Sequence, residues 1–175
     1  FVTVASIVSL SVLVPFIVER EQNGREAVKS FIDDIFSFFT FLILATCLVA
    51  FFAIPKLSPI LFKGFEAGEI SQLIFVSRIL LLSPILLGFS NLFGSLTQAY
   101  NRFLIYAFAP VLYNLGIIIG IFFLSPRFGI SGVALGVIIG SLLHVAIQIP
   151  FVVKMGLMPK LHHFFSLSSI RRVVG

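Results

Sequence analysis

The sequence predicts an all-α integral membrane protein, built as a polytopic helix bundle. Hydrophobic residues make up 59% of the 175 residues and charged residues only 11%, whereas soluble domains contain about 45–50% apolar and about 25% charged residues. The mean hydropathy is +1.15. The apolar residues also form unbroken runs of about the 20 residues that a helix needs to cross a bilayer. Together these observations exclude a soluble domain with a single core.

Charged residues and clusters of Pro and Gly divide the chain into five predicted transmembrane spans within one membrane domain, residues 1–175. The spans cover residues 1–18, 35–54, 73–96, 103–124 and 130–153. Residues 19–34 read as a charged loop, and residues 55–71 as a short interfacial excursion. The last two connections are tight, so they predict antiparallel neighbours. Because the chain opens inside an apolar run without an initiator Met, we expect it to be a fragment.

The basic residues are unevenly divided between the two predicted sides of the membrane. Cytoplasmic loops carry an excess of Lys and Arg. The ends of spans one, three and five are therefore expected in the cytoplasm, with Phe1 outside and Gly175 inside. Basic residues at the cytoplasmic margin explain the net charge of +5 without a nucleic-acid partner. The residues on this side are Arg20, Arg25, Lys29, Arg102, Lys154, Lys160, Arg171 and Arg172.

The seven acidic residues all lie in predicted loops or at span ends. A proton relay, a carboxylate cation site or an acid/base enzyme needs ionisable groups inside the membrane, so we expect neither catalytic residues nor a cofactor. His144 and Gln148 share a helix face but lack a third ligand, which makes a poor metal site. The single Cys47 excludes an intramolecular disulfide and reads as a packing residue.

Arg78 is the one strong charge that enters a predicted span. Pointing inward, its guanidinium could bind a phosphate through paired donors; snorkelling to the outer interface is the more common use of such a residue. Polar side chains on spans three to five could also line a cavity, although hydrogen bonds between helices are their more common role. These further candidates are Asn91, Gln98, Asn114, His144 and Gln148.

Two patterns predict how the helices are shaped and packed. Pro84 predicts a kink in the third span. Glycines at four-residue intervals predict smooth stripes that allow close backbone approach, and in a transporter such stripes also allow helices to slide. The stripes are Gly116 and Gly120 on the fourth span and Gly132, Gly136 and Gly140 on the fifth.

Several of these residues belong to a wider pattern. It comprises Arg78-Ile79, Ser83-Pro84-Ile85, Asn101-Arg102-Phe103, Ala107-Phe108-Ala109-Pro110, Tyr113-Asn114, Gly136 through Gly140, and Gln148-Ile149-Pro150. This pattern resembles the MurJ (MviN) family of lipid II flippases, in the multidrug/oligosaccharidyl-lipid/polysaccharide exporter superfamily. The resemblance runs from about residue 78 to residue 158 and is looser before that. It implies that the five spans correspond to helices two to six of a fourteen-helix protein.

The resemblance implies the N-terminal lobe of a two-lobed exporter in the bacterial cytoplasmic membrane. The family moves an undecaprenyl-diphosphate-linked peptidoglycan precursor outward by alternating access. The expected partners are this lipid-linked diphosphate-sugar substrate, membrane lipids and the remaining helices. The arginines that the family uses lie mainly outside this stretch, and residues 1–6 carry no charge where the family often has one. Asn101 and Arg102, in a short cytoplasmic turn, and Pro110 suggest structural or gating roles.

Two other readings remain open at this point. Another exporter of the superfamily, either a polysaccharide-lipid flippase or a cation-coupled drug exporter, would share the same helices. Several arginines in a cavity would favour a diphosphate lipid, whereas an intramembrane Asp or Glu would favour drug/cation antiport. A non-transporting membrane scaffold is supported only by the uncharged start of the first span.

Overall fold

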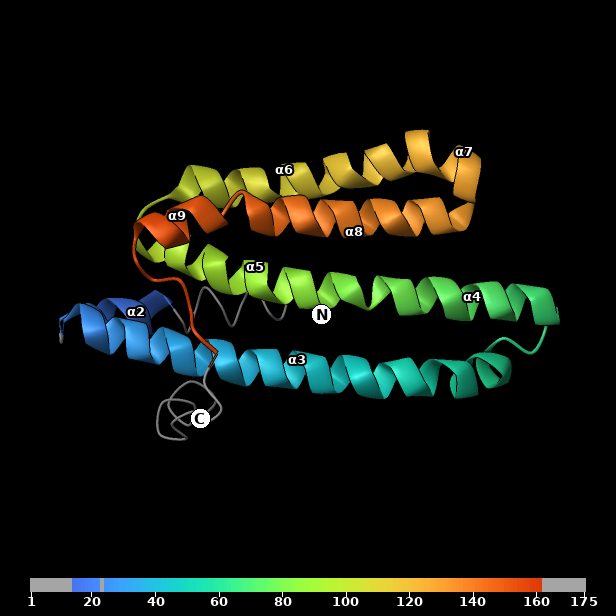
Figure 1. Ribbon diagram of the computed structural model, residues 1–175, viewed down its shortest axis with the longest axis horizontal. Coiled ribbons are helices and arrows are strands. Elements are labelled where there is room, and N and C mark those ends of the chain that lie inside the picture. Colours follow the sequence, from blue (N-terminus) through green and yellow to red (C-terminus); the bar gives the residue numbers. More distant parts are fainter. Residues whose placement is uncertain (1–13, 23, 162–175) are drawn as a thin grey trace.

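The computed structural model describes residues 14–22 and 24–161, and within them helices are joined by short connections (Figure 1). The predicted all-α class is confirmed for these residues. The elements are α2 (Val14–Glu21), α3 (Arg25–Leu61), α4 (Ala67–Leu80), α5 (Leu82–Ala99), α6 (Phe103–Ile119), the π-helical turn η2 (Gly120–Leu124), α7 (Ser125–Phe128), α8 (Ile130–Ala146) and α9 (Ile149–Lys154).

Four helical segments in the described part of the chain are long and apolar enough to cross a membrane. They are Arg25–Leu61, Ala67–Ala99, Phe103–Phe128 and Ile130–Lys154. These segments contain the predicted second to fifth spans. Most of the predicted first span, residues 1–18, lies outside the described residues.

The long helices lie side by side in an open row (Figure 1). α3 contacts α4 and α5, these two contact α8, and α8 contacts α6, so that α3 and α6 form the two edges of the row. The buried apolar core lies at the end of the row that carries α2 and α9. Its buried members are Ile17, Val28, Phe31, Ile32, Ile35, Phe93, Leu96, Val145, Val152 and Leu157.

Helix α3 is longer than the apolar run that predicted it. It begins at Arg25, inside the predicted loop, and continues through Pro55 and Pro59 to Leu61. Of residues 55–71, which were predicted as one interfacial connection, residues 55–61 belong to α3 and residues 67–71 to α4, so that only residues 62–66 join the two helices. A proline inside a helix leaves the carbonyl four residues earlier without its helical donor. Transmembrane helices tolerate this where another donor reaches the freed group.

The interruption between α4 and α5 lies where the kink was predicted. It falls at Leu81, one turn before Pro84, which lies in the first turn of α5. Pro84 has no N–H for the Leu80 carbonyl and its ring crowds that group, which favours an interruption of the helix at this point.

Helix α5 ends in a Schellman motif that requires a left-handed residue. Asn101 takes this position with a φ of 58°. Its N–H donates to the Gln98 carbonyl at 3.0 Å, and the Arg102 N–H donates to the Thr97 carbonyl at 2.7 Å. Asn tolerates this conformation better than most residues with a Cβ. Asn101 and Arg102 therefore end helix α5 and form the turn before α6.

Candidate functional site

Helices α6 and α8 pack with their backbones in direct contact, and the glycines that predicted a seam lie in this interface. A Cβ built on Gly120 would lie 2.5 Å from the Cα of Gly136, a distance at which no side chain fits. Gly116 meets the backbone at Gly140 in the same way, and Gly132 meets the backbone of Leu124 in η2. Close approach of this kind is the main use of small residues between membrane helices.

A cluster of polar side chains lies between α5 and the α8–α9 junction. The Ser83 and Ser141 hydroxyl oxygens are 2.7 Å apart. Further along, the Ser90 hydroxyl lies 2.5 Å from Nδ1 of His144. Nε2 of Gln148 donates to the Ser90 hydroxyl and, at 3.0 Å, to the His144 carbonyl. Ser90, Ser141 and Gln148 are completely buried.

This cluster has the chemistry of a helix contact. Within residues 14–22 and 24–161, no group of three His, Cys, Asp or Glu side chains could hold a metal ion. Its hydroxyl, imidazole and amide groups bond to one another across the interface, which stabilises helix pairing in a membrane. Oε1 of Gln148 is the exception, since it has no hydrogen-bond partner among the described residues.

The structure does not bring the six predicted cavity residues together. His144 and Gln148 belong to the buried cluster. Gln98 is buried, and its Nε2 donates to the Gly94 carbonyl one turn earlier at 3.1 Å. Asn91 is half-buried on α5. Asn114 differs from all of these, because it is exposed on α6, at the edge of the row.

Arg78 lies near the end of α4 and holds it against α3. Its Nε donates to the Phe51 carbonyl at 3.3 Å, and its guanidinium carbon lies 4.1 Å from the centroid of the Phe51 ring. The Phe51 carbonyl is the group that Pro55 deprives of a helical donor. Arg78 therefore completes the backbone hydrogen bonding that the proline interrupts.

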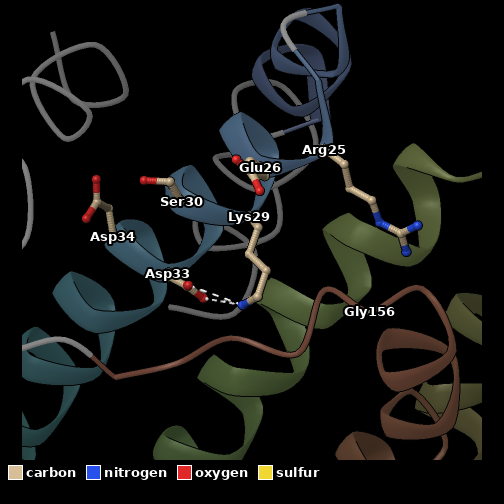
Figure 2. A pocket seen from close by; sticks show the side chains of 7 residues that line it. All are labelled: Arg25, Glu26, Lys29, Ser30, Asp33, Asp34 and Gly156. Atoms are coloured by element: carbon tan, nitrogen blue, oxygen red, sulfur yellow. Dashed lines mark hydrogen bonds and ion pairs between the residues drawn. The ribbon is translucent and has the colours of Figure 1, made fainter.

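A charged groove of about 490 Å³ lies at the end of the row that carries α2 and α9 (Figure 2). Lys29 and Asp33 point toward each other in it, with Nζ of Lys29 3.2 Å from each carboxylate oxygen of Asp33, while Asp34 points away. The lining residues are Arg25, Glu26, Lys29, Ser30, Asp33, Asp34 and Gly156.

Residues 155–161, which we call the strap, follow α9 and lie along α3 at this groove. Arg25 donates to the Met155 carbonyl, and Lys29 donates to the Met158 carbonyl at 3.1 Å. The Asp33 carboxylate accepts from the Lys160 N–H at 2.8 Å. Residues four apart share one helix face, so these three α3 side chains form a ladder that binds successive backbone groups of the strap.

Sequence reasoning missed this ladder. It treated Arg25 and Lys29 only as markers of the cytoplasmic side and Asp33 as a loop residue. The available signal was the four-residue spacing of Arg25, Lys29, Asp33 and Ser37, which continues the ladder by one turn. The Ser37 hydroxyl donates to the Asp33 carbonyl at 2.7 Å and lies 3.5 Å from the Lys160 carbonyl.

A tyrosine at the end of α5 adds a further contact at this end of the row. Burial raises the pKa of Tyr100, and the negative charge of Glu21 together with a side-chain hydrogen bond to it raises the pKa further. Glu21 is the last residue of α2, and it lines a small pocket together with Tyr100, so the end of α2 lies near the turn that carries Asn101.

Comparison with known proteins decides the family. The family model described as "Lipid II flippase MurJ" matches residues 9–175. The chain belongs to the MurJ family. This is a family of transporters rather than enzymes, as the absence of a predicted intramembrane acid had suggested. Its members reside in the inner membrane, in agreement with the four membrane-spanning segments found here.

Individual MurJ proteins match over most of the chain. A probable lipid II flippase MurJ of Borreliella burgdorferi is 32% identical over 141 residues, which cover 78% of this chain and 27% of the relative. A probable lipid II flippase MurJ of Buchnera aphidicola is 28% identical, with 85% and 30% covered. The lipid II flippase MurJ of Burkholderia cenocepacia is 27% identical, with 83% and 29% covered. The chain spans less than a third of the length of these curated relatives.

Proposed function

We propose that the chain forms part of the N-terminal lobe of a lipid II flippase. The complete protein would move an undecaprenyl-diphosphate-linked peptidoglycan precursor across the bacterial cytoplasmic membrane by alternating access. The observation that carries this proposal is the MurJ family match over residues 9–175. The open row of four membrane helices supports it, because such a row leaves both of its faces available to further helices and to a cavity between lobes.

We propose further that the end carrying α2 and α9 faces the cytoplasm. Arg25, Lys29 and Lys154 belong to the elements at this end, whereas Lys63 belongs to the α3–α4 connection and Arg127 to α7, both at the opposite end. The charge asymmetry supports this orientation because cytoplasmic margins are enriched in Lys and Arg. The strap would then lie on the cytoplasmic surface.

Rocking of the lobe requires its helices to move together. The glycine seam joins α6 to α8, the buried Ser90–His144–Gln148 cluster joins α8 to α5, and Arg78 joins α4 to α3. These contacts support motion of the row as one body. They also favour packing roles over substrate contact for Asn91, Gln98, His144 and Gln148, which are buried or half-buried on α5 and at the α8–α9 junction.

Arg78 remains our candidate for a contact with the substrate diphosphate. Only its Nε donates to Phe51, and the two terminal amino groups have no hydrogen-bond partner among the described residues. Such a pair of donors matches two phosphate oxygens. Because Arg78 also supports α3, its structural role and its transport role must be separated.

Pro55 makes that separation possible. Arg78→Ala is expected to destabilise the full-length protein by about 1–3 kcal/mol, since the Phe51 carbonyl loses its donor. Adding Pro55→Ala restores a helical N–H for this carbonyl and should recover the melting temperature. We expect the double variant to remain defective in supporting growth of flippase-depleted bacteria. Full recovery of growth by the double variant would show that Arg78 acts only on the structure.

The flippase proposal itself is tested by complementation. The full-length protein is expected to restore growth to bacteria depleted of their own lipid II flippase, with immunoblotting of the membrane fraction as the control for insertion. Failure of the inserted protein to rescue would count against lipid II as the substrate. Rescue of a polysaccharide-lipid flippase mutant, or export of a cationic drug, would then identify the other exporter classes, and failure of all three assays would favour the scaffold.

A further inference from the structure

Two neighbouring helices are interrupted at the same depth in the row. In α3, Pro55 leaves the Phe51 carbonyl without its helical donor, and Arg78 reaches this carbonyl from α4. In the segment formed by α4 and α5, regular helix stops at Leu81. The thiol of Cys47, one turn before Phe51, donates to the Leu81 carbonyl at 3.6 Å. The two interruptions therefore lie side by side, within about one helical turn of each other.

The hydrogen bonds at both interruptions are those of a helix that can bend. The Leu81 N–H is shared between the Ser77 carbonyl at 3.2 Å and the Arg78 carbonyl at 3.3 Å. The second of these bonds is of the 3₁₀ type, which in the middle of a helical segment often marks a hinge. On α3, the Ser58 hydroxyl donates to the Ile54 carbonyl at 2.7 Å, a bond that often accompanies helix bending. Each helix therefore has a bend point at this depth.

The chain is packed less tightly beyond these interruptions than before them. Residues 55–80, which we call the distal hairpin, comprise the end of α3, the connection and α4, and Ser58 is the only buried residue among them. A Cβ on Gly68 would meet nothing within 4 Å. The hairpin also reaches past α7 at the end of the row (Figure 1). On the other side of the interruptions, α3 contributes to the buried core, and a Cβ on Gly88 would collide with the Ile43 side chain. Segments with few buried contacts open at the lowest free energy.

Arg78 joins the distal hairpin to the rest of α3 across the bend point. It belongs to the hairpin, whereas Phe51 lies on the other side of Pro55. The guanidinium binds Phe51 twice, through the hydrogen bond from Nε to the carbonyl at 3.3 Å and through its position 4.1 Å from the ring centroid. A backbone carbonyl without a donor is costly in a membrane. The contact therefore favours the straight arrangement of the hairpin.

We propose that the distal hairpin bends as a unit about Pro55 and Leu81, and that Arg78 is the clasp that holds it straight. With the clasp closed, the hairpin moves together with the row. With the clasp open, the ends of α3 and α4 move against α6 and α8 while the buried core stays packed. A few residues at the ends of packed elements absorb the backbone change in a hinge of this kind. The proposal concerns the mechanics of two helices and is independent of which substrate is carried.

Spin-label distances in the full-length protein, measured by double electron–electron resonance in lipid bilayers, test the proposal. One pair joins Lys63→Cys in the hairpin to Arg127→Cys in α7, and the control pair joins Arg127→Cys to Lys154→Cys across α8; all three positions are exposed. Cys47 is replaced by Ala. A bend of about 20° on an arm as long as α4, about 21 Å, moves the tip by about 7 Å. In Arg78→Ala we expect the first distance to shift or broaden by about this amount and the control distance to stay unchanged.

Adding Pro55→Ala to Arg78→Ala returns a helical N–H to the Phe51 carbonyl and should restore the narrow first distance. Three results overturn the proposal. An unchanged first distance in Arg78→Ala would mean that the hairpin is rigid without the clasp. Broadening of both pairs would mean that the whole row loosens. Continued broadening in the double variant would mean that α3 does not bend at its proline. Should Arg78→Ala fail to accumulate in the membrane, Arg78→Lys replaces it; it loses the planar contact with the Phe51 ring and is expected to broaden the first distance to a smaller extent, and no broadening would again overturn the proposal.

Discussion

Replacing Gly136 with Val is expected to force α6 away from α8 and to remove most of the stable protein from the membrane. The Cα of Gly120 lies 2.5 Å from where the first side-chain carbon would be placed. The obstacle is helix backbone, which cannot rotate aside as a side chain can. Overpacking a well-packed interior typically costs about 1–3 kcal/mol and occasionally more, and a backbone clash along a whole seam belongs at the upper end of that range or beyond it.

The measurement is the melting temperature of the full-length protein in detergent, together with its abundance in the membrane. Gly68→Ala is the matched control. Gly68 lies in the first turn of α4, and a Cβ there meets nothing within 4 Å. This control should melt at or slightly above the temperature of the unmodified protein, because Ala favours helix over Gly. Equal melting of the two variants would mean that α6 and α8 do not touch through their glycines.

Asp33→Ala is expected to release the strap from α3. The Asp33 side chain is 10% exposed and accepts from both Lys29 and the backbone N–H of Lys160. Its removal leaves the Lys160 N–H without its acceptor and Lys29 without its counter-charge. Losing a partly buried hydrogen-bond acceptor costs about 1–3 kcal/mol. The effect should be local, and amide hydrogen exchange should speed up in residues 157–160 before the membrane helices lose protection.

Glu26→Ala provides the matched control for the strap. Glu26 lines the same groove two turns earlier and carries the same charge, but it is exposed. This variant should leave exchange in the strap unchanged, since surface charges contribute little to stability. Equally fast exchange in both variants would assign the effect to the net charge of the groove and not to the ladder of contacts.

The second to fifth spans, as helices long and apolar enough to cross a membrane, and the family could be read from the sequence because their signals are local or contiguous. A run of about 20 apolar residues predicts a membrane helix wherever it packs. The four-residue spacing of Gly132, Gly136 and Gly140 likewise predicts a smooth face on any helix. The break near Pro84 follows from the chemistry of a single residue.

Other features could not be read in this way because they join distant residues. The helical course of α3 through Pro55 depends on Arg78, which lies 27 positions away from its acceptor at Phe51. The ladder on α3 depends on backbone groups that lie about 130 positions later in the chain, as the separations of 129 and 130 for Lys29 and Arg25 show. Neither pairing leaves a local pattern in the sequence.

By itself, the sequence determined that this protein is a helical membrane protein of the MurJ type, because hydropathy, glycine spacing and proline chemistry act over short stretches. Tertiary structure alone decided which polar residues are used in packing and which remain exposed. Gln148 and Asn114 are both amides on predicted spans, yet the first is completely buried between helices and the second lies at the edge of the row. The difference arises because burial depends on which neighbour covers a helix face, and neighbours come from distant parts of the chain.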